Sequence, residues 1–270
     1  MAVTALTVPS GSVGPLLRSW RRRRNLSQFQ LSLRAAVSSR HLSFVETGRS
    51  RPSRELVLHL AEQLEIPLRE RNVLLLAAGY APVYRERSLD AADLAPARAA
   101  LERFLRAHEP YPALVLDGRY TILSANDAVD RLVEGIAPAL LAPPANALRV
   151  TLHPEGMALR IANFAEWSGH LLQRLRRRAA LTGGPELDRL HAELAEYPGV
   201  ALEPPTAAGA ADILVPLRLR TEGAELAFFS TVSTFETAAD ITLDELCVEA
   251  FYPADAATAN RLLREVALDA

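Results

Sequence analysis

The chain has 270 residues and a formal net charge of −2, and all 30 of its basic residues are arginine. This length leaves room for two domains or one large one. Cys247 is the single cysteine, which excludes an intramolecular disulfide and a cysteine-based metal cluster. No apolar run approaches the roughly 18 residues of a membrane span. The N-terminus lacks a signal-peptide pattern, so the sequence predicts a soluble, cytoplasmic protein.

The charge is distributed unevenly along the chain. The first 80 residues contain 12 Arg and 5 acidic residues, a net charge of +7. From Ala81 onward there are 18 Arg and 27 acidic residues, a net charge of −9. The basic N-terminal part is therefore suited to bind a polyanion, whereas the acidic remainder of the chain is not.

Residues 26–52 carry the strongest local pattern of the sequence. Ser27 is a good helix N-cap, and Gln30 completes a capping box with it. Ser38 can cap a second short helix, which would end at Gly48. A turn of three or four residues joins the two predicted helices. This arrangement is typical of a helix-turn-helix, whose second helix is presented to the major groove of DNA.

Three further helices surround this pattern. The first has Pro15 in its opening turn and ends in the run 21–24, four arginines that indicate either a solvated helix end or, for one or two of them, phosphate contacts. Ser53 caps a fourth helix, and Pro67 opens a fifth. The sequence therefore predicts a disordered segment over 1–12, a five-helix domain over 13–81, a linker over 82–96 and a second domain over 97–270.

The second domain mixes helices and strands. An amphipathic helix is expected over 97–107, with Leu101, Phe104 and Leu105 inward. The Asp117-Gly118 pair predicts a hairpin between strands 113–116 and 120–123. A loop over 138–144 precedes helices over 157–181 and 185–196. Strands are expected from alternation around 213–220 and over 226–235 and 245–252, with a closing helix over 255–266.

This order of elements predicts an α+β protein of two domains. In the second domain two strands, a helical middle and three strands follow one another, which is the order of a PAS-type antiparallel sheet. The helical insert is larger than usual for such a sheet.

Two runs of residues resemble a known family. The first run is similar to the XRE (Cro/CI-type) repressors. It consists of Leu26-Ser27-Gln28, Leu31, Val37-Ser38, Leu42, Val45-Glu46, Gly48 and Pro52-Ser53. The later run from Arg71 to Pro82 resembles the subgroup with an MmyB-like C-terminal domain. The resemblance implies a PAS-like second domain that encloses a fatty-acyl ligand. One position departs from the pattern, because Ala36 stands where the family usually has Gly in the turn.

Candidate DNA contacts follow from the helix-turn-helix and the resemblance. The outward positions of the second helix can read base edges through Arg, Ser and an aromatic ring. Packing within the domain is an equal alternative for Phe44. The family's backbone-contacting glutamine corresponds to Gln28, and its phosphate-contacting loop to two later arginines. The set is Gln28, Ser39, Arg40, Ser43, Phe44, Arg49 and Arg51.

No catalytic or metal site is predicted. The histidines of the second domain are isolated, and neither a phosphate loop, an HExxH zinc pair nor a GxSxG elbow occurs. The resemblance instead implies an apolar pocket, with His170 and Arg174 as candidate donors to an acyl carboxylate. Each apolar candidate is by default an ordinary core residue, and only a cavity would make the group a pocket lining. These candidates are Leu114, Leu116, Phe164, Trp167, Leu171, Phe228 and Phe235.

We therefore expect a DNA-binding transcriptional regulator, not an enzyme. Its partners would be a double-stranded operator, a second copy of the chain, and a fatty acid or similar amphiphile. No other cofactor is expected. The main alternative makes the second domain a dimerisation or protein-partner module whose apolar residues only fill a core. An enzyme with an appended DNA-binding domain would require an acid–base pair that the sequence does not offer.

Overall fold

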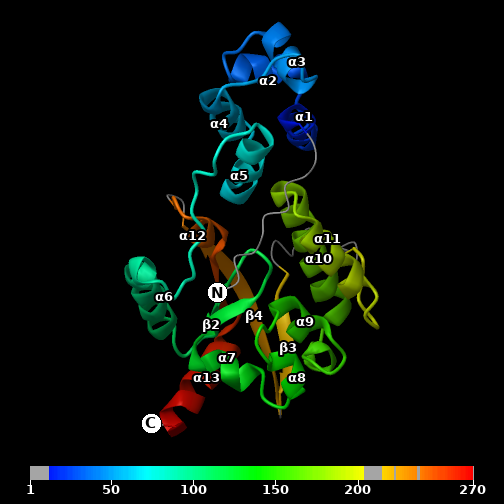
Figure 1. The fold of residues 1–270 in the computed structure, drawn as a ribbon. Coiled ribbons are helices and arrows are strands. Elements are labelled where there is room, and N and C mark those ends of the chain that lie inside the picture. Colours follow the sequence, from blue (N-terminus) through cyan, green and yellow to red (C-terminus); the bar gives the residue numbers. More distant parts are fainter. Residues whose placement is uncertain (1–11, 204–214, 222, 236–237, 270) are drawn as a thin grey trace. The chain divides into compact units, whose positions relative to one another are not determined.

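The computed structural model describes residues 12–203, 215–221, 223–235 and 238–269 (Figure 1). The chain divides into two compact units. The N-terminal unit comprises residues up to Arg87 together with 180–183 and 237–244, and the C-terminal unit comprises the rest. The expectations for residues 1–11 and for strand positions Ile213 and Leu214 lie outside the described residues.

The N-terminal unit contains the five predicted helices. Their bounds are α1 Val13–Arg23, α2 Gln28–Arg34, α3 Ser39–Glu46, α4 Arg54–Gln63 and α5 Leu68–Ala77. The predicted capping box at Ser27 is confirmed, because its Oγ accepts from the Gln30 backbone N–H while the Gln30 side chain accepts from the Ser27 backbone N–H. Ser38 and Ser53 cap α3 and α4 through one bond each, because their side chains accept from the backbone N–H groups of His41 and Leu56. These local bonds fix where the helices begin.

The turn between α2 and α3 is held by a left-handed residue. Ala36 has φ of +51°, the conformation that Gly adopts at least cost. Beneath the turn, Leu31 of α2 and Leu42 of α3 are fully buried. They pack with Leu17 of α1 and Leu60 of α4 in one core. The sequence period of the apolar positions thus places α3 on the surface of a small, closed helical unit.

A five-stranded antiparallel sheet forms the centre of the C-terminal unit. Its strands are β1 Ala113–Leu116, β2 Ile122–Ala125, β3 Leu217–Thr221, β4 Ala224–Thr234 and β5 Cys247–Pro253. They are arranged in the order β2-β1-β5-β4-β3. The α+β fold class and the PAS-like strand order are confirmed. The predicted hairpin joins β1 and β2, and the helical insert lies between β2 and β3.

Helices cover both faces of this sheet (Figure 1). Glu249 of β5 faces the long helix α10, whereas Tyr252, on the opposite face of the same strand, contacts His108 at the end of α6. The helices of the C-terminal unit are α6 Ala95–Ala107, α7 Asp127–Leu132, α8 Pro138–Leu141, α9 Ala147–Leu152, α10 Phe164–Thr182, α11 Pro185–Ala195 and α13 Ala256–Asp269, with 3₁₀ turns η1 Ala92–Leu94 and η2 Ala158–Arg160. The short helix α12 Ile241–Glu245 belongs to the N-terminal unit except for its last residue. The core between α10 and the sheet contains the site described below.

Three expectations were wrong in detail. The long helix begins at Phe164 and not at 157, because the preceding segment bonds to β3 instead: Ala162 donates to the carbonyl of Arg218. The segment predicted as a loop over 138–144 contains the short helix α8. Phe104, expected inward, is 37% exposed, while its neighbours Leu101 and Leu105 are buried. No described helix is long and apolar enough to cross a membrane.

Candidate functional site

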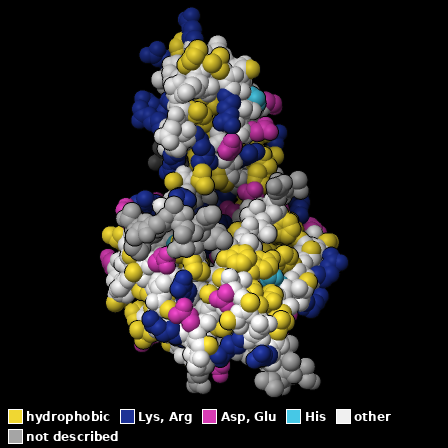
Figure 2. Space-filling view, turned by 180° about the vertical axis from the view of Figure 1, so that it is seen from behind, with side chains coloured by type: hydrophobic (Ala, Val, Ile, Leu, Met, Phe, Trp, Pro, Cys, Tyr) yellow, Lys and Arg dark blue, Asp and Glu magenta, His cyan; other side chains and the backbone are white. Residues whose placement is uncertain are grey.

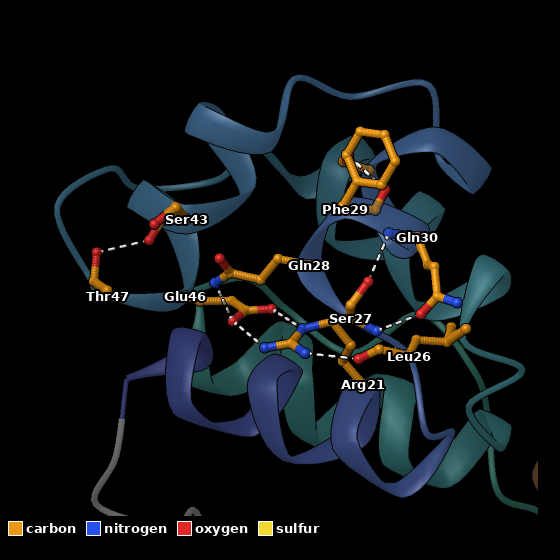
Figure 3. Close-up of polar contacts among 10 residues, drawn as sticks. Arg21, Leu26, Ser27, Gln28, Phe29, Gln30, Ser43, Glu46 and Thr47 are labelled. Carbon is orange, nitrogen blue, oxygen red and sulfur yellow. Dashed lines mark hydrogen bonds and ion pairs between the residues drawn. The ribbon is translucent and has the colours of Figure 1, made fainter.

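The outward side chains of α3 are held by contacts within the N-terminal unit. The Ser39 hydroxyl is 2.7 Å from that of Ser32 on α2, which ties the two helices of the motif together. Arg40 is exposed, and its guanidinium lies 5.4 Å from the ring centroid of the half-buried Phe44. Ser43 accepts a hydrogen bond from Thr47 through its backbone carbonyl (Figure 3). The α3 surface therefore presents a positioned cation beside small polar groups.

A buried ion pair fixes α3 on α1 (Figure 3). The Arg21 guanidinium donates to both oxygens of Glu46 at 2.6 and 2.8 Å, and the Gln28 amide donates to Glu46 at 2.8 Å. Burial alone would raise the pKa of the Glu46 carboxyl. Hydrogen bonds from Arg21 and Gln28 and the nearby positive charges outweigh burial and hold this pKa below its ordinary value. The arrangement fixes the orientation of Gln28 at the start of α2.

The arginine run 21–24 does not serve as a uniform phosphate-binding segment. Arg21 is buried in the ion pair just described. Arg24 donates to the backbone carbonyls of Leu64 and Glu65 at the end of α4. Of the four arginines, Arg22 and Arg23 have exposed side chains.

The loop after α3 contains two arginines in different situations. Arg51 donates to the carbonyl of Ala78 at 3.2 Å and lies over the Tyr80 ring, so part of its role is to hold the loop against the end of α5. Arg49 is exposed. Figure 2 shows Arg side chains projecting around the N-terminal unit. This cationic surface and the helix-turn-helix form a candidate DNA-binding face.

A narrow apolar pocket lies in the C-terminal unit between the sheet and the helical insert. Leu114 of β1, Leu217 of β3 and Phe251 of β5 form its sheet side. Helices α7, α9 and α10 supply the remaining wall through residues that include Val133, Leu148, Trp167 and Leu171. Its cavity volume is about 70 Å³. That is below the roughly 300 Å³ at which small-molecule pockets usually begin.

The polar part of the pocket wall is an ion pair between α10 and β5. Arg174 donates to the two oxygens of Glu249 at 2.6 and 3.0 Å, and the Ser230 hydroxyl donates to Glu249 at 3.2 Å. Burial would lower the pKa of Arg174, but the charge and hydrogen bonds of Glu249 outweigh it and raise this pKa. Arg174 therefore stays charged within a mostly apolar wall.

Four of the nine candidate ligand residues line this pocket: Leu114, Trp167, Leu171 and Arg174. The remaining five do not line it. Leu116 and Phe228 are fully buried core residues, and Phe164 packs half-buried at the edge of that core. His170 is half-buried and stacks on Trp167, and burial together with Arg174 lowers its pKa. Phe235 lies just beyond the end of β4.

Sequence reasoning missed Glu249 and the contributions of α7 and α9. A sequence signal for Glu249 did exist. It is an acidic residue at an alternate position inside the apolar run 247–251, where burial requires a charged partner. Leu132 and Leu148 belong to short helices, and Val133 directly follows the first of them. Helices of six residues are too short for their apolar periodicity to reveal an inward face. Among the described residues, no cluster of His, Cys, Asp and Glu could hold a metal ion.

Comparisons with known proteins match both units. A family model described as "Helix-turn-helix domain" matches residues 12–74. A second, described as "MmyB-like transcription regulator ligand binding domain", matches residues 97–264. A search among curated proteins gave no match.

One solved structure is also similar, titled "Structure of an RNA-binding Light-Oxygen-Voltage Receptor", with a TM-score of 0.30 and 15% identity. The alignment covers 93% of this chain and 62% of that chain. The second family model covers more than half of the protein, and the helix-turn-helix precedes it. The chain therefore belongs to the MmyB-like transcription regulators, which combine a helix-turn-helix with a ligand-binding domain.

Proposed function

We propose that this protein is a sequence-specific regulator whose affinity for its operator depends on an apolar small molecule in the C-terminal unit, a fatty acid or similar amphiphile. The observation that carries the proposal is the apolar pocket between α10 and the sheet, with its single polar wall. An elongated apolar ligand with one polar end would match such a lining. Each methylene buried contributes about 0.8 kcal/mol, so a chain of ordinary length could offset the cost of its immobilisation.

The cavity of about 70 Å³ holds only a few atoms, so an acyl chain requires the pocket to widen. Besides the long helix α10, the wall opposite the sheet contains two short helices, α7 and α9, of six residues each. It also contains Met157, a flexible side chain that adapts to different shapes. We propose that these elements move away from the sheet when the ligand enters. Such a movement would change the C-terminal unit between the free and bound states.

The DNA side of the proposal rests on α3. Arg40 occupies the second position of the helix, and the first turn of a recognition helix meets base edges. We assign base reading to Arg40, with Ser39, Ser43 and Phe44 around it. Gln28, Arg49 and, in part, Arg51 would contact the phosphate backbone. A homodimer on the operator completes this function.

Because the cavity is small, one alternative function is also tested: the C-terminal unit serves only dimerisation. The experiment that decides between them uses the full-length chain, stripped of lipid, and an operator selected from a randomised DNA library. Binding of decanoic acid and of its methyl ester is measured by calorimetry. Operator affinity is measured by fluorescence anisotropy with and without each compound.

Leu171→Trp provides the matched variant, because the larger ring would fill the pocket. We expect it to bind the amphiphiles at least tenfold more weakly and to lose their effect on operator affinity. Leu172→Met is the control, since Leu172 is fully buried on the same helix but does not line the pocket. If no amphiphile binds the wild-type chain or changes its operator affinity, the dimerisation function replaces the one proposed.

A further inference from the structure

One residue that lines the pocket carries a buried hydrogen-bond donor for which the described part of the chain offers no acceptor. Trp167 lines the pocket, and the residue is 3% exposed. Its indole Nε1 is buried and has no hydrogen-bond partner among the described residues. The indole group can only donate, and native proteins seldom leave such a buried donor unsatisfied. A donor kept in this state in a ligand pocket points to an acceptor on the bound molecule.

The position of the indole is well defined. Trp167, Leu171 and Arg174 follow one another at helical spacing along α10, and all three line the pocket. The Trp167 ring stacks on His170, with 5.6 Å between the ring centroids and 25° between the planes. The ring therefore has support on one side, and Trp167 lies one turn of helix from Leu171 and two from Arg174.

The charged groups of the pocket neutralise each other. Arg174 and Glu249 form a two-bond ion pair, and their side chains are 26% and 6% exposed. No other charged residue lines the pocket, and all of its lining residues are described. A ligand carboxylate that shared Arg174 would place a second anion beside Glu249, and one that took Arg174 away would leave Glu249 buried without a countercharge. Either outcome opposes an anionic head group.

We propose that the polar end of the ligand is an uncharged hydrogen-bond acceptor, such as the carbonyl oxygen of an acyl ester or amide, and that Trp167 Nε1 donates to it. This inference rests on the proposed function and narrows its ligand, a fatty acid or similar amphiphile, to an amphiphile with an uncharged head group. The ion pair stays intact when the ligand is bound and excludes free carboxylates. The resemblance at the level of sequence implied a fatty acid, so the pocket chemistry refines that expectation.

The test compares methyl decanoate, N-methyl decanamide and decanoate, which share one chain length, on the full-length, lipid-stripped chain at pH 8, where decanoate is ionised. We expect the ester and amide to bind about tenfold tighter than the carboxylate. Trp167→Phe keeps an aromatic ring but removes the donor. It should weaken ester binding about five- to tenfold, the usual effect of one hydrogen bond, and leave the weaker carboxylate binding unchanged.

Glu249→Gln provides a second, independent variant. It removes the countercharge and leaves Arg174 as an unpaired cation, so it should reverse the preference and favour decanoate over the ester. Circular dichroism verifies that each variant is folded. Tighter binding of decanoate by the wild-type chain, or undiminished ester binding by Trp167→Phe, would overturn the head-group assignment alone. Absence of binding by all three compounds would overturn the ligand function itself, and the assignment with it.

Discussion

Single residues decide how α3 is held. Glu46 is fully buried and accepts from Arg21 and Gln28, and its pKa is held below the ordinary range. A carboxylate whose pKa is depressed by folding stabilises the native state above its unfolded pKa of about 4.3. This contribution is lost as the pH falls through the lower folded pKa. The ion pair thus connects the position of the recognition helix to acid stability.

We expect Glu46→Gln to lower the free energy of unfolding of the N-terminal unit at pH 7 by about 3–5 kcal/mol, because Arg21 remains buried without its partner. The difference between wild type and variant should shrink as the pH falls below about 4. Urea unfolding is followed through Trp20 fluorescence in a Trp167→Phe background, so that the signal comes from the N-terminal unit alone. Glu55→Gln, an exposed acidic residue of α4, is the control and should change little. A pH-independent difference would contradict the ion-pair account.

Ala36 is a second residue with a defined energetic role. Its φ of +51° is costly for any side chain with a Cβ, by about 1 kcal/mol relative to Gly. Ala36→Gly should therefore stabilise the N-terminal unit by about that amount in the same unfolding experiment. Ala35→Gly is the matched control, because Ala35 has φ of −87° and gains nothing from Gly. It should destabilise the unit by roughly 0.5–1 kcal/mol or more. A loss of stability on Ala36→Gly would show that the turn is not strained.

At the level of elements, prediction from sequence succeeded where the determinants are local. The starts of α2, α3 and α4 follow from Ser27, Ser38 and Ser53, each of which bonds within three residues. The start of α10 was placed seven residues early, because apolar periodicity cannot show that the segment before Phe164 bonds to β3. The two ion pairs, Arg21–Glu46 and Arg174–Glu249, join residues that are 25 and 75 positions apart along the chain. Neither could be inferred before the fold was known.

The recognition helix and the loop after it should contribute differently to DNA binding. Arg40→Ala should reduce affinity for the selected operator by about 1–3 kcal/mol and leave binding to random duplex nearly unchanged. Arg49→Ala should weaken both duplexes alike and lower the slope of log affinity against log salt by about one. Fluorescence anisotropy at four salt concentrations measures both quantities. Equal losses on operator and random DNA for Arg40→Ala would remove this residue from base reading.

For the whole molecule, regulation requires that the ligand distinguishes two states of the protein. A tenfold change in operator affinity corresponds to about 1.4 kcal/mol of differential binding, and a ligand with equal affinity for both states would change nothing. The proposed widening of the pocket supplies such a difference. The ion pair of Arg174 and Glu249 joins α10 to β5. A ligand that moved the helices of the insert would therefore act on the whole C-terminal unit.

The assembly on DNA follows from the size of the recognition helix. The α3 helix has eight residues and can contact only a few base pairs, too few to select one site in a genome. Helix-turn-helix proteins solve this by binding two half-sites about one helical turn, or roughly 34 Å, apart as dimers. We expect two protomers per operator at saturation in analytical ultracentrifugation, and a selected operator with two-fold symmetry. Inserting five base pairs between the half-sites turns them to opposite sides of the duplex and should abolish tight binding, whereas altering the sequence of the same spacer should have a smaller effect. Saturation by a single protomer, or tolerance of the five-base-pair insertion, would show that one N-terminal unit suffices for recognition.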